Sequence, residues 1–234
     1  MTRSWSIARV AAGAALAAWA FVFWFVLLAG RSSLYLSPRV SWVVPVGAVM
    51  LTLAAAGKIA SARTAQPEPL TRRDAVTLGL FTIPVVLLLA LPPQTLGAYA
   101  VGRRPAFATG VSSSAEDIAS GDLTLFEVAG AQSTRDGLDA LQRRAGETVE
   151  WVGFVSRSAS TPANELYLNR FIISCCVADA QGANIRIVNV PAGKFQENDW
   201  VRVEGTFYPL GRNIIVDADE VVGVPKPAQP YLSP

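Results

Sequence analysis

Apolar and polar positions follow two different patterns on either side of about residue 104. The first part holds three long uncharged stretches, separated by short segments that carry arginine or lysine. The second part mixes apolar and polar residues with strand-like alternation and frequent turn residues. This pattern predicts a helical membrane region at 1–104, a flexible linker at 105–121 and a mainly β domain at 122–234.

Three apolar segments are long enough to cross a bilayer as helices. The first, at about 10–30, lies between Arg9 and Arg31 and spans about 30 Å at 1.5 Å per residue. It is too long and too bulky for the apolar region of a cleaved signal peptide. The second and third, at about 40–57 and 75–91, are shorter. We expect three spanning helices, with a re-entrant segment as the alternative for the second.

Positive charge predicts how these helices are oriented. Arg3 and Arg9 precede the first helix, and four more basic residues lie in the loop 58–73. The other short loop has only its two bounding arginines. The positive-inside rule therefore places the N-terminus and the loop 58–73 in the cytoplasm, and the C-terminal domain outside. If the second segment does not span, the domain lies inside instead.

Charge also separates the two parts and excludes several functions. Of the 234 residues, 51% are hydrophobic; residues 1–104 hold ten basic and two acidic side chains, a net +8. Residues 105–234 hold ten basic and sixteen acidic side chains, a net −6, which argues against nucleic-acid binding. The chain has no histidine, which excludes Ser-His-Asp and Cys-His catalytic sites and imidazole metal ligands. We therefore expect that the protein is not an enzyme.

The C-terminal part has the spacing of a small β-barrel. A short strand is predicted at 123–126, and a helix capped at Ser133 or Thr134 runs to about Arg144. Five further strands follow, at 148–155, 166–174, 184–190, 200–207 and 213–216. Gly153 and Gly205 suit sharp bends or bulges within strands. The pattern predicts a Greek-key barrel of the OB type, with a β-sandwich as the alternative.

The only cysteines of the chain, Cys175 and Cys176, are adjacent within the stretch Asn169–Ala180. Neighbouring side chains on a regular strand point to opposite faces, so both thiols can share a ligand only at a bulge or turn. Three interpretations remain open. The cysteines pack as small apolar residues, form a redox-active pair, or bind a soft metal such as zinc or copper, or a thiophilic solute, with Asp179 as a further ligand.

Several segments together resemble one protein family. The run Arg170–Ala180 with its double cysteine, the strand Trp200–Thr206, the ending Pro227–Tyr231, and Pro92-Pro93 followed by Leu96-Gly97 are similar to the YcgQ-like permease subunits. The resemblance covers most of the chain. It implies a membrane-anchored protein with an extracytoplasmic β-domain that works with a multi-spanning permease of the YcgR type.

Two functional classes follow. In the first, the chain is an accessory subunit of a transport complex, and Cys175, Cys176 and Asp179 capture or hand over a metal or thiophilic solute. In the second, it is an envelope module whose barrel recognises a protein or glycan, and the cysteines only pack. The acidic run Asp217–Glu220 is expected to be a solvated strand end rather than a catalytic pair.

Overall fold

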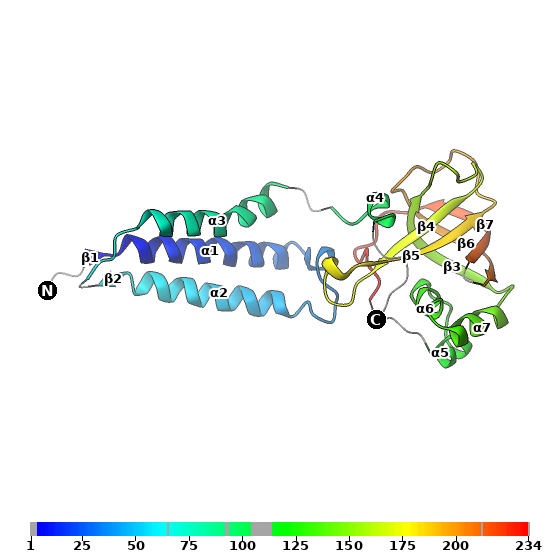
Figure 1. The fold of residues 1–234 in the computed structure, drawn as a ribbon, viewed down its shortest axis with the longest axis horizontal. Helices are drawn as coiled ribbons and strands as arrows, with labels where there is room; N and C mark the ends of the chain where they lie inside the picture. The colour runs from blue at the N-terminus through cyan, green and yellow to red at the C-terminus, as the bar shows by residue number, and fades with distance from the viewer. Residues whose placement is uncertain (1–3, 65, 92–93, 104–113, 212, 234) are drawn as a thin grey trace. The chain divides into compact units, whose positions relative to one another are not determined.

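The chain divides into two compact units, Met1–Gln94 and Thr95–Pro234 (Figure 1). The structure, a computed structural model, describes residues 4–64, 66–91, 94–103, 114–211 and 213–233. Pro92-Pro93 and residues 105–113 of the expected linker lie outside these ranges.

The first unit contains the three expected membrane helices. They are α1 Ile7–Leu28, α2 Val43–Ala60 and α3 Arg72–Ala90, and each is long and apolar enough to cross a membrane. A short 3₁₀ helix, η1 Ser32–Leu34, lies between the first two. The capping box of Thr71 and Asp74 begins α3, because each residue satisfies a backbone N–H of the other. The chain is therefore membrane-associated.

Tryptophan side chains connect the three helices. Trp24 on α1 donates its indole N–H to Thr52 Oγ1 on α2, at 3.1 Å. Trp19, also on α1, donates to the backbone oxygen of Phe81 on α3 at 3.0 Å, and the two rings pack 5.6 Å apart. Most apolar side chains of α3 remain exposed within the unit, as expected for a surface that faces lipid.

The N-terminus and the loop before α3 meet at one end of this unit. Strand β1 Ser4–Trp5 pairs antiparallel with β2 Arg63–Thr64. Arg9 donates to the backbone oxygen of Ser61 at 3.0 Å and forms an ion pair with Glu68 at 3.4 Å. The two segments predicted to share the cytoplasmic side are thus joined directly, so α1 and α2 run in opposite directions between the two ends of the unit.

Among the described residues of the second unit, four short helices precede the barrel: α4 Ala98–Val101, α5 Ala115–Ser120, α6 Leu125–Ala131 and α7 Arg135–Arg143. Thr134 caps α7, as predicted. The prediction of a strand at 123–126 is wrong. Thr124 and Glu127 form a capping box there and begin α6 instead. The last part of the expected linker is helix α5.

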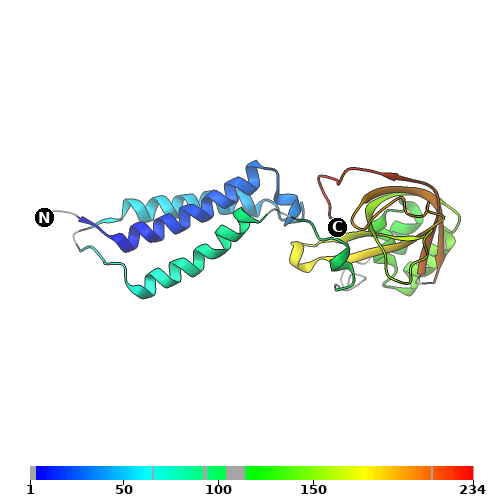
Figure 2. The same ribbon diagram turned by 90° about the horizontal axis from the view of Figure 1, so that it is seen from above.

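Five strands then close into the predicted barrel (Figure 2). They are β3 Thr148–Ser156, β4 Leu166–Ile172, β5 Gln181–Val188, β6 Trp200–Leu210 and β7 Asn213–Gly223. The order around the barrel is β3-β4-β5-β7-β6, with β5 and β7 parallel and all other pairs antiparallel. This is the arrangement of an OB-like barrel, which confirms the predicted fold class.

Two glycines allow the strands to bend as the barrel closes. The register of β6 against β7 shifts between Glu204 and Gly205, and a Cβ atom on Gly205 would overlap the backbone oxygen of Asp217. A Cβ atom on Gly153 would lie 2.6 Å from the backbone oxygen of Asn169. The bulge or close approach expected at each position is therefore present.

The second unit has two apolar clusters. The larger one fills the barrel and continues beneath α5, α6 and α7. We call the smaller one the outer cluster; its buried members are Phe154, Phe171, Ile173, Ala180 and Tyr231. Side chains from 96–101 and Val177 pack against it. The outer cluster includes Ile173 and Ala180, which flank the two cysteines in the chain.

Candidate functional site

The cysteine turn, defined here as residues 173–180, connects β4 to β5. Ile172 and Gln181 are the last paired residues of the two strands. The predicted strand therefore ends two residues early, and Cys175 and Cys176 lie in the turn rather than on the sheet. A short 3₁₀ helix, η2 Val177–Asp179, completes the connection.

Both ends of the cysteine turn are anchored in the outer cluster. Ile173 and Ala180 are buried, whereas Ser174 and Cys175 between them are exposed. The C-terminal tail fixes the first end, because Leu232 accepts from the N–H of Ile173 at 2.9 Å and donates to the oxygen of Phe171 at 2.8 Å. The turn is thus held at its base and presents its tip to solvent.

Arg170 and Tyr231 attach the tail to the rest of the unit. Arg170 donates to the backbone oxygens of Gln229 at 2.6 Å and Pro230 at 3.2 Å. The hydroxyl of Tyr231 accepts from the N–H of Leu96 at 3.1 Å. The segments around Leu96 and Tyr231, which are far apart in the sequence and similar to the YcgQ-like family, therefore meet beneath the cysteine turn.

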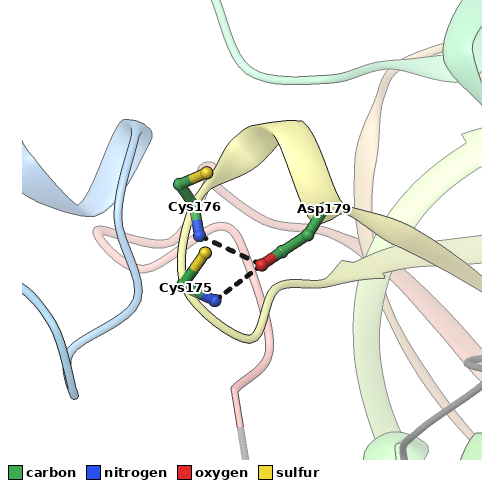
Figure 3. A group of neighbouring side chains, drawn as sticks. All are labelled: Cys175, Cys176 and Asp179. Carbon is green, nitrogen blue, oxygen red and sulfur yellow. Dashed lines mark hydrogen bonds between the residues drawn. The ribbon is translucent and has the colours of Figure 1, made fainter.

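The carboxylate of Asp179 organises the tip of the turn (Figure 3). It accepts hydrogen bonds from the backbone N–H groups of Ser174 at 3.1 Å, Cys175 at 2.8 Å and Cys176 at 3.3 Å. Three donors converging on one carboxylate close the turn in the way that an acidic residue closes a helix N-terminus. Asp179 therefore has a structural role in addition to the ligand role predicted from the sequence.

The same geometry brings the two thiols together. The sulfur atoms of Cys175 and Cys176 and a carboxylate oxygen of Asp179 all lie within 4.8 Å of one another. Cys175 is exposed, and Cys176 and Asp179 are half-buried. Adjacent cysteines on a regular strand would point to opposite faces, so they can share a ligand only at a bulge or turn. Cys175 and Cys176 lie in such a turn, and both thiols can therefore reach one ligand. The exposure of Cys175 also argues against simple apolar packing of that side chain.

The pKa of the Cys175 thiol and the pKa of the Asp179 carboxyl are shifted in opposite directions. The hydrogen bond to Asp179, helped by Cys176 and by desolvation, raises the pKa of Cys175 to about 11. For Asp179, desolvation raises the pKa, but hydrogen bonds from the Cys175 thiol and from the three N–H groups outweigh it and lower the pKa. At neutral pH the site therefore holds a protonated Cys175 beside an ionised carboxylate.

This donor set fits a soft cation. Thiolate sulfur is the ligand that Cu(I), Zn²⁺ and related metals prefer, and a carboxylate oxygen is an accepted third ligand. A bound cation would favour loss of the thiol protons, which opposes the effect of Asp179 on Cys175. Three donors leave a tetrahedral metal one open position, so the arrangement can accept a ligand from solution or from a partner.

The sequence did not reveal the residues that support the turn. Asp179 was predicted as a ligand, but not as the acceptor for three backbone N–H groups. Its position three residues after Cys176 and five after Ser174 is the signal that was available, since this spacing is typical of side-chain caps. The contact of the C-terminal tail with Ile173 had no local signal, because it joins residues about 60 positions apart.

Part of the chain matches a known protein family. Residues 138–234 match the family described as the DUF1980 C-terminal domain. This range contains all five barrel strands and the cysteine turn, and it is consistent with the resemblance to the YcgQ-like family. No curated protein matches the chain. The match supports the identity of the barrel as a distinct domain, and its description names no activity.

Proposed function

We propose that this chain is a membrane-anchored accessory subunit of a transport complex, whose barrel presents a vicinal-thiol site to a soft metal ion or thiophilic solute. The observation that carries the proposal is the convergence of Cys175, Cys176 and Asp179, with all ligand atoms within 4.8 Å. The three membrane helices and the resemblance to YcgQ-like permease subunits support the anchor and the transport context.

The partner in this proposal is a multi-spanning permease of the YcgR type. Within the first unit, α3 leaves nearly all of its apolar window exposed, so it offers a surface for another membrane helix as well as for lipid. The cysteine turn would then deliver its cargo to the permease or receive it from there. The positive-inside rule places this exchange on the extracytoplasmic side.

Cys175 and Cys176 would hold the cargo through sulfur, and Asp179 would provide an oxygen ligand or the acceptor for a thiol proton. The raised pKa of Cys175 makes capture proton-coupled, because a thiol must lose its proton before it binds a metal. Return of this proton to the Cys175 sulfur would favour release of the cargo. An exposed, three-donor site suits transfer better than permanent storage, since the open position allows an incoming ligand to displace one already bound.

The alternative, an envelope module whose cysteines only pack, predicts thiols that are shielded until the protein unfolds. Cys175 is exposed instead, and Ser174 and Ala178 beside it are exposed as well. This observation favours a ligand-binding thiol site over cysteines that only pack. An exposed turn of this kind also suits a contact with a partner protein, so the permease and the cargo can share the same surface.

The test combines genetics with purification. Deleting the chain should impair transport of, or resistance to, a thiophilic metal, and a Cys175→Ser, Cys176→Ser double variant should do the same while remaining in the membrane. The tagged chain should co-purify with a multi-spanning permease. Purification without any permease would overturn the subunit proposal, and normal transport by the double-serine variant would remove the thiol role.

A further inference from the structure

A polar cavity of about 500 Å³ lies on the outer face of the barrel, and it contains no residue of the cysteine turn. It lies between the α4 segment and the edge of the sheet formed by β3, β4 and β5. Its lining residues are Ala98, Tyr99, Val101, Gly102, Arg103, Ser156, Arg157, Ser158, Tyr167, Asn169 and Asn184. The volume is in the range of small-molecule sites in proteins.

Hydrogen bonds hold both walls of this cavity in place. On the α4 side, the N–H of Ala98 donates to Asn198 Oδ1 at 2.7 Å, which fixes the segment against the barrel. On the sheet side, Asn169 of β4 lies directly opposite Asn184 of β5, so both side chains are on one face. The cavity is therefore a feature of the folded unit.

Asn169 contributes a buried acceptor with no partner. The residue is 2% exposed, and its Nδ2 donates to the oxygen of Tyr167 at 2.8 Å, to Ser156 Oγ at 2.8 Å and to the oxygen of Phe154 at 3.3 Å. Because backbone oxygens only accept, these contacts fix the amide orientation. Its Oδ1 then has no hydrogen-bond partner among the described residues, and leaving a buried acceptor unpaired is energetically unfavourable.

Arg157 contributes a matching pair of donors. Its Nε and Nη2 atoms are buried and lack a hydrogen-bond partner among the described residues. The N–H groups of these two atoms lie on the same edge of the guanidinium and point in parallel, which is the geometry that grips two oxygens of a phosphate or carboxylate. Two buried unpaired donors and a buried unpaired acceptor around one cavity indicate a ligand that supplies both kinds of partner.

The cavity is positively charged, although its domain is acidic. Besides Arg157, its lining includes Arg103, whose guanidinium lies 4.1 Å from the ring centroid of Tyr99. No Asp or Glu belongs to the lining that the structure describes. Two arginines without a neutralising acid favour an anion, and a doubly charged phosphate suits them better than a single carboxylate.

We propose that this cavity binds a hydroxyl-bearing phosphate. The phosphate oxygens accept from Nε and Nη2 of Arg157, and a hydroxyl of the ligand donates to Asn169 Oδ1, once side-chain rotation on binding opens these buried atoms to the cavity. Arg103 adds charge at the rim. Glycerol phosphate is the smallest common group with both features. It occurs as a free solute, with a doubly charged phosphate monoester, and in the headgroup of phosphatidylglycerol, with a singly charged phosphodiester. Both sources present a phosphate with two free oxygens and a hydroxyl to the cavity.

Calorimetry on the full chain in a zwitterionic detergent tests this site, with glycerol phosphate and inorganic phosphate as probes. Glycerol phosphate should bind more tightly than inorganic phosphate, because only it reaches Asn169. Arg157→Lys keeps the charge but loses the paired donors, and should weaken binding about tenfold. Arg202→Gln is the matched control: this arginine lies on β6 outside the cavity, its side chain is 42% exposed, and binding should stay within about twofold of wild type.

A second variant and a lipid arm complete the experiment. Arg103→Gln changes an exposed side chain, so it should keep the melting temperature and still weaken binding several-fold. Competition by nanodiscs of phosphatidylglycerol, but not phosphatidylcholine, would identify the lipid headgroup as the source, and no competition would identify a free solute. Failure of both phosphate probes to bind the wild type, or unchanged binding in folded Arg157→Lys and Arg103→Gln, would overturn the proposal. Neither result bears on the cysteine turn.

Discussion

Asp179 shapes the cysteine turn and raises the pKa of the Cys175 thiol. Its carboxylate accepts from three backbone N–H groups and raises the pKa of Cys175 to about 11. Because only the thiolate reacts with alkylating agents, Cys175 should be labelled slowly at neutral pH despite its exposure. Slow labelling at neutral pH therefore distinguishes this site from an activated nucleophile, and a rate that rises steeply with pH in the folded protein distinguishes it from a buried cysteine.

Replacing that carboxylate should speed the labelling. In a Cys176→Ser background, Asp179→Asn should increase the rate of Cys175 alkylation at pH 8 by about tenfold and lower the pH at which the rate is half-maximal. Mass spectrometry after timed exposure to iodoacetamide measures the rate. Asp219→Asn, at an exposed position on β7, is the control and should change nothing. Equal pH midpoints for the parent and Asp179→Asn would show that the carboxylate does not control the thiol.

Asp179 should also stabilise the second unit in a pH-dependent way. Its pKa is lowered in the folded protein, because hydrogen bonds to the carboxylate outweigh desolvation. Such a group contributes stability above its unfolded pKa, and the contribution is lost as the pH falls through the lower folded pKa. Asp179→Ala should therefore cost about 1–2 kcal/mol at pH 7 and less in acid. Denaturant unfolding at several pH values measures this, and a pH-independent difference would contradict it.

At the scale of elements, the bulge in β6 depends on Gly205. A Cβ atom there would overlap the backbone of Asp217 in β7, where no flexible side chain can move away. Gly205→Ala should therefore destabilise the barrel by about 2 kcal/mol or more. At Gly182 in β5 the nearest atom to such a Cβ is 3.9 Å away, so Gly182→Ala should cost little. Thermal unfolding of the two variants and the wild type measures both losses of stability. Equal melting temperatures for the two variants would contradict the prediction.

The elements that the sequence predicted well were those with long or regular patterns. The three apolar runs and the alternation of Trp200–Phe207 depend on local composition, and each appears as expected. The strand predicted at 123–126 failed because its apolar residues suggested a strand, although Thr124 and Glu127 already carried the capping-box signal. Local hydrogen bonding decided the structure there.

The candidate site was predictable only in part. Adjacent cysteines and a nearby acid identified the segment, and geometry required a turn, which is present. The contacts between the turn and the C-terminal tail, and the cavity around Arg157 and Asn169, could not be predicted. They depend on which strands become neighbours and on which polar atoms lack partners, and neither is encoded in local spacing.

For the whole molecule, the joining of the N-terminus to the loop before α3 supports a topology with both on one side of the membrane. The positive-inside rule predicts that this side is cytoplasmic and that the barrel lies outside. In a Cys175→Ser, Cys176→Ser background, Lys226→Cys should react with a membrane-impermeant maleimide in intact cells, whereas Gln66→Cys should react only after lysis. The reverse labelling pattern would place the barrel in the cytoplasm.

The central claim, a thiol site for a soft cation, is tested most directly by titrating the full-length protein in detergent with Cd²⁺. Ultraviolet absorption by cadmium–thiolate bonds reports binding. We predict saturation at one equivalent, tighter binding at higher pH because protons are released, and about tenfold weaker binding in Asp179→Asn. The absorption should disappear in the Cys175→Ser, Cys176→Ser variant. No thiolate absorption from the wild type with excess Cd²⁺, or equal Cd²⁺ affinity in the wild type and Asp179→Asn, would contradict the account.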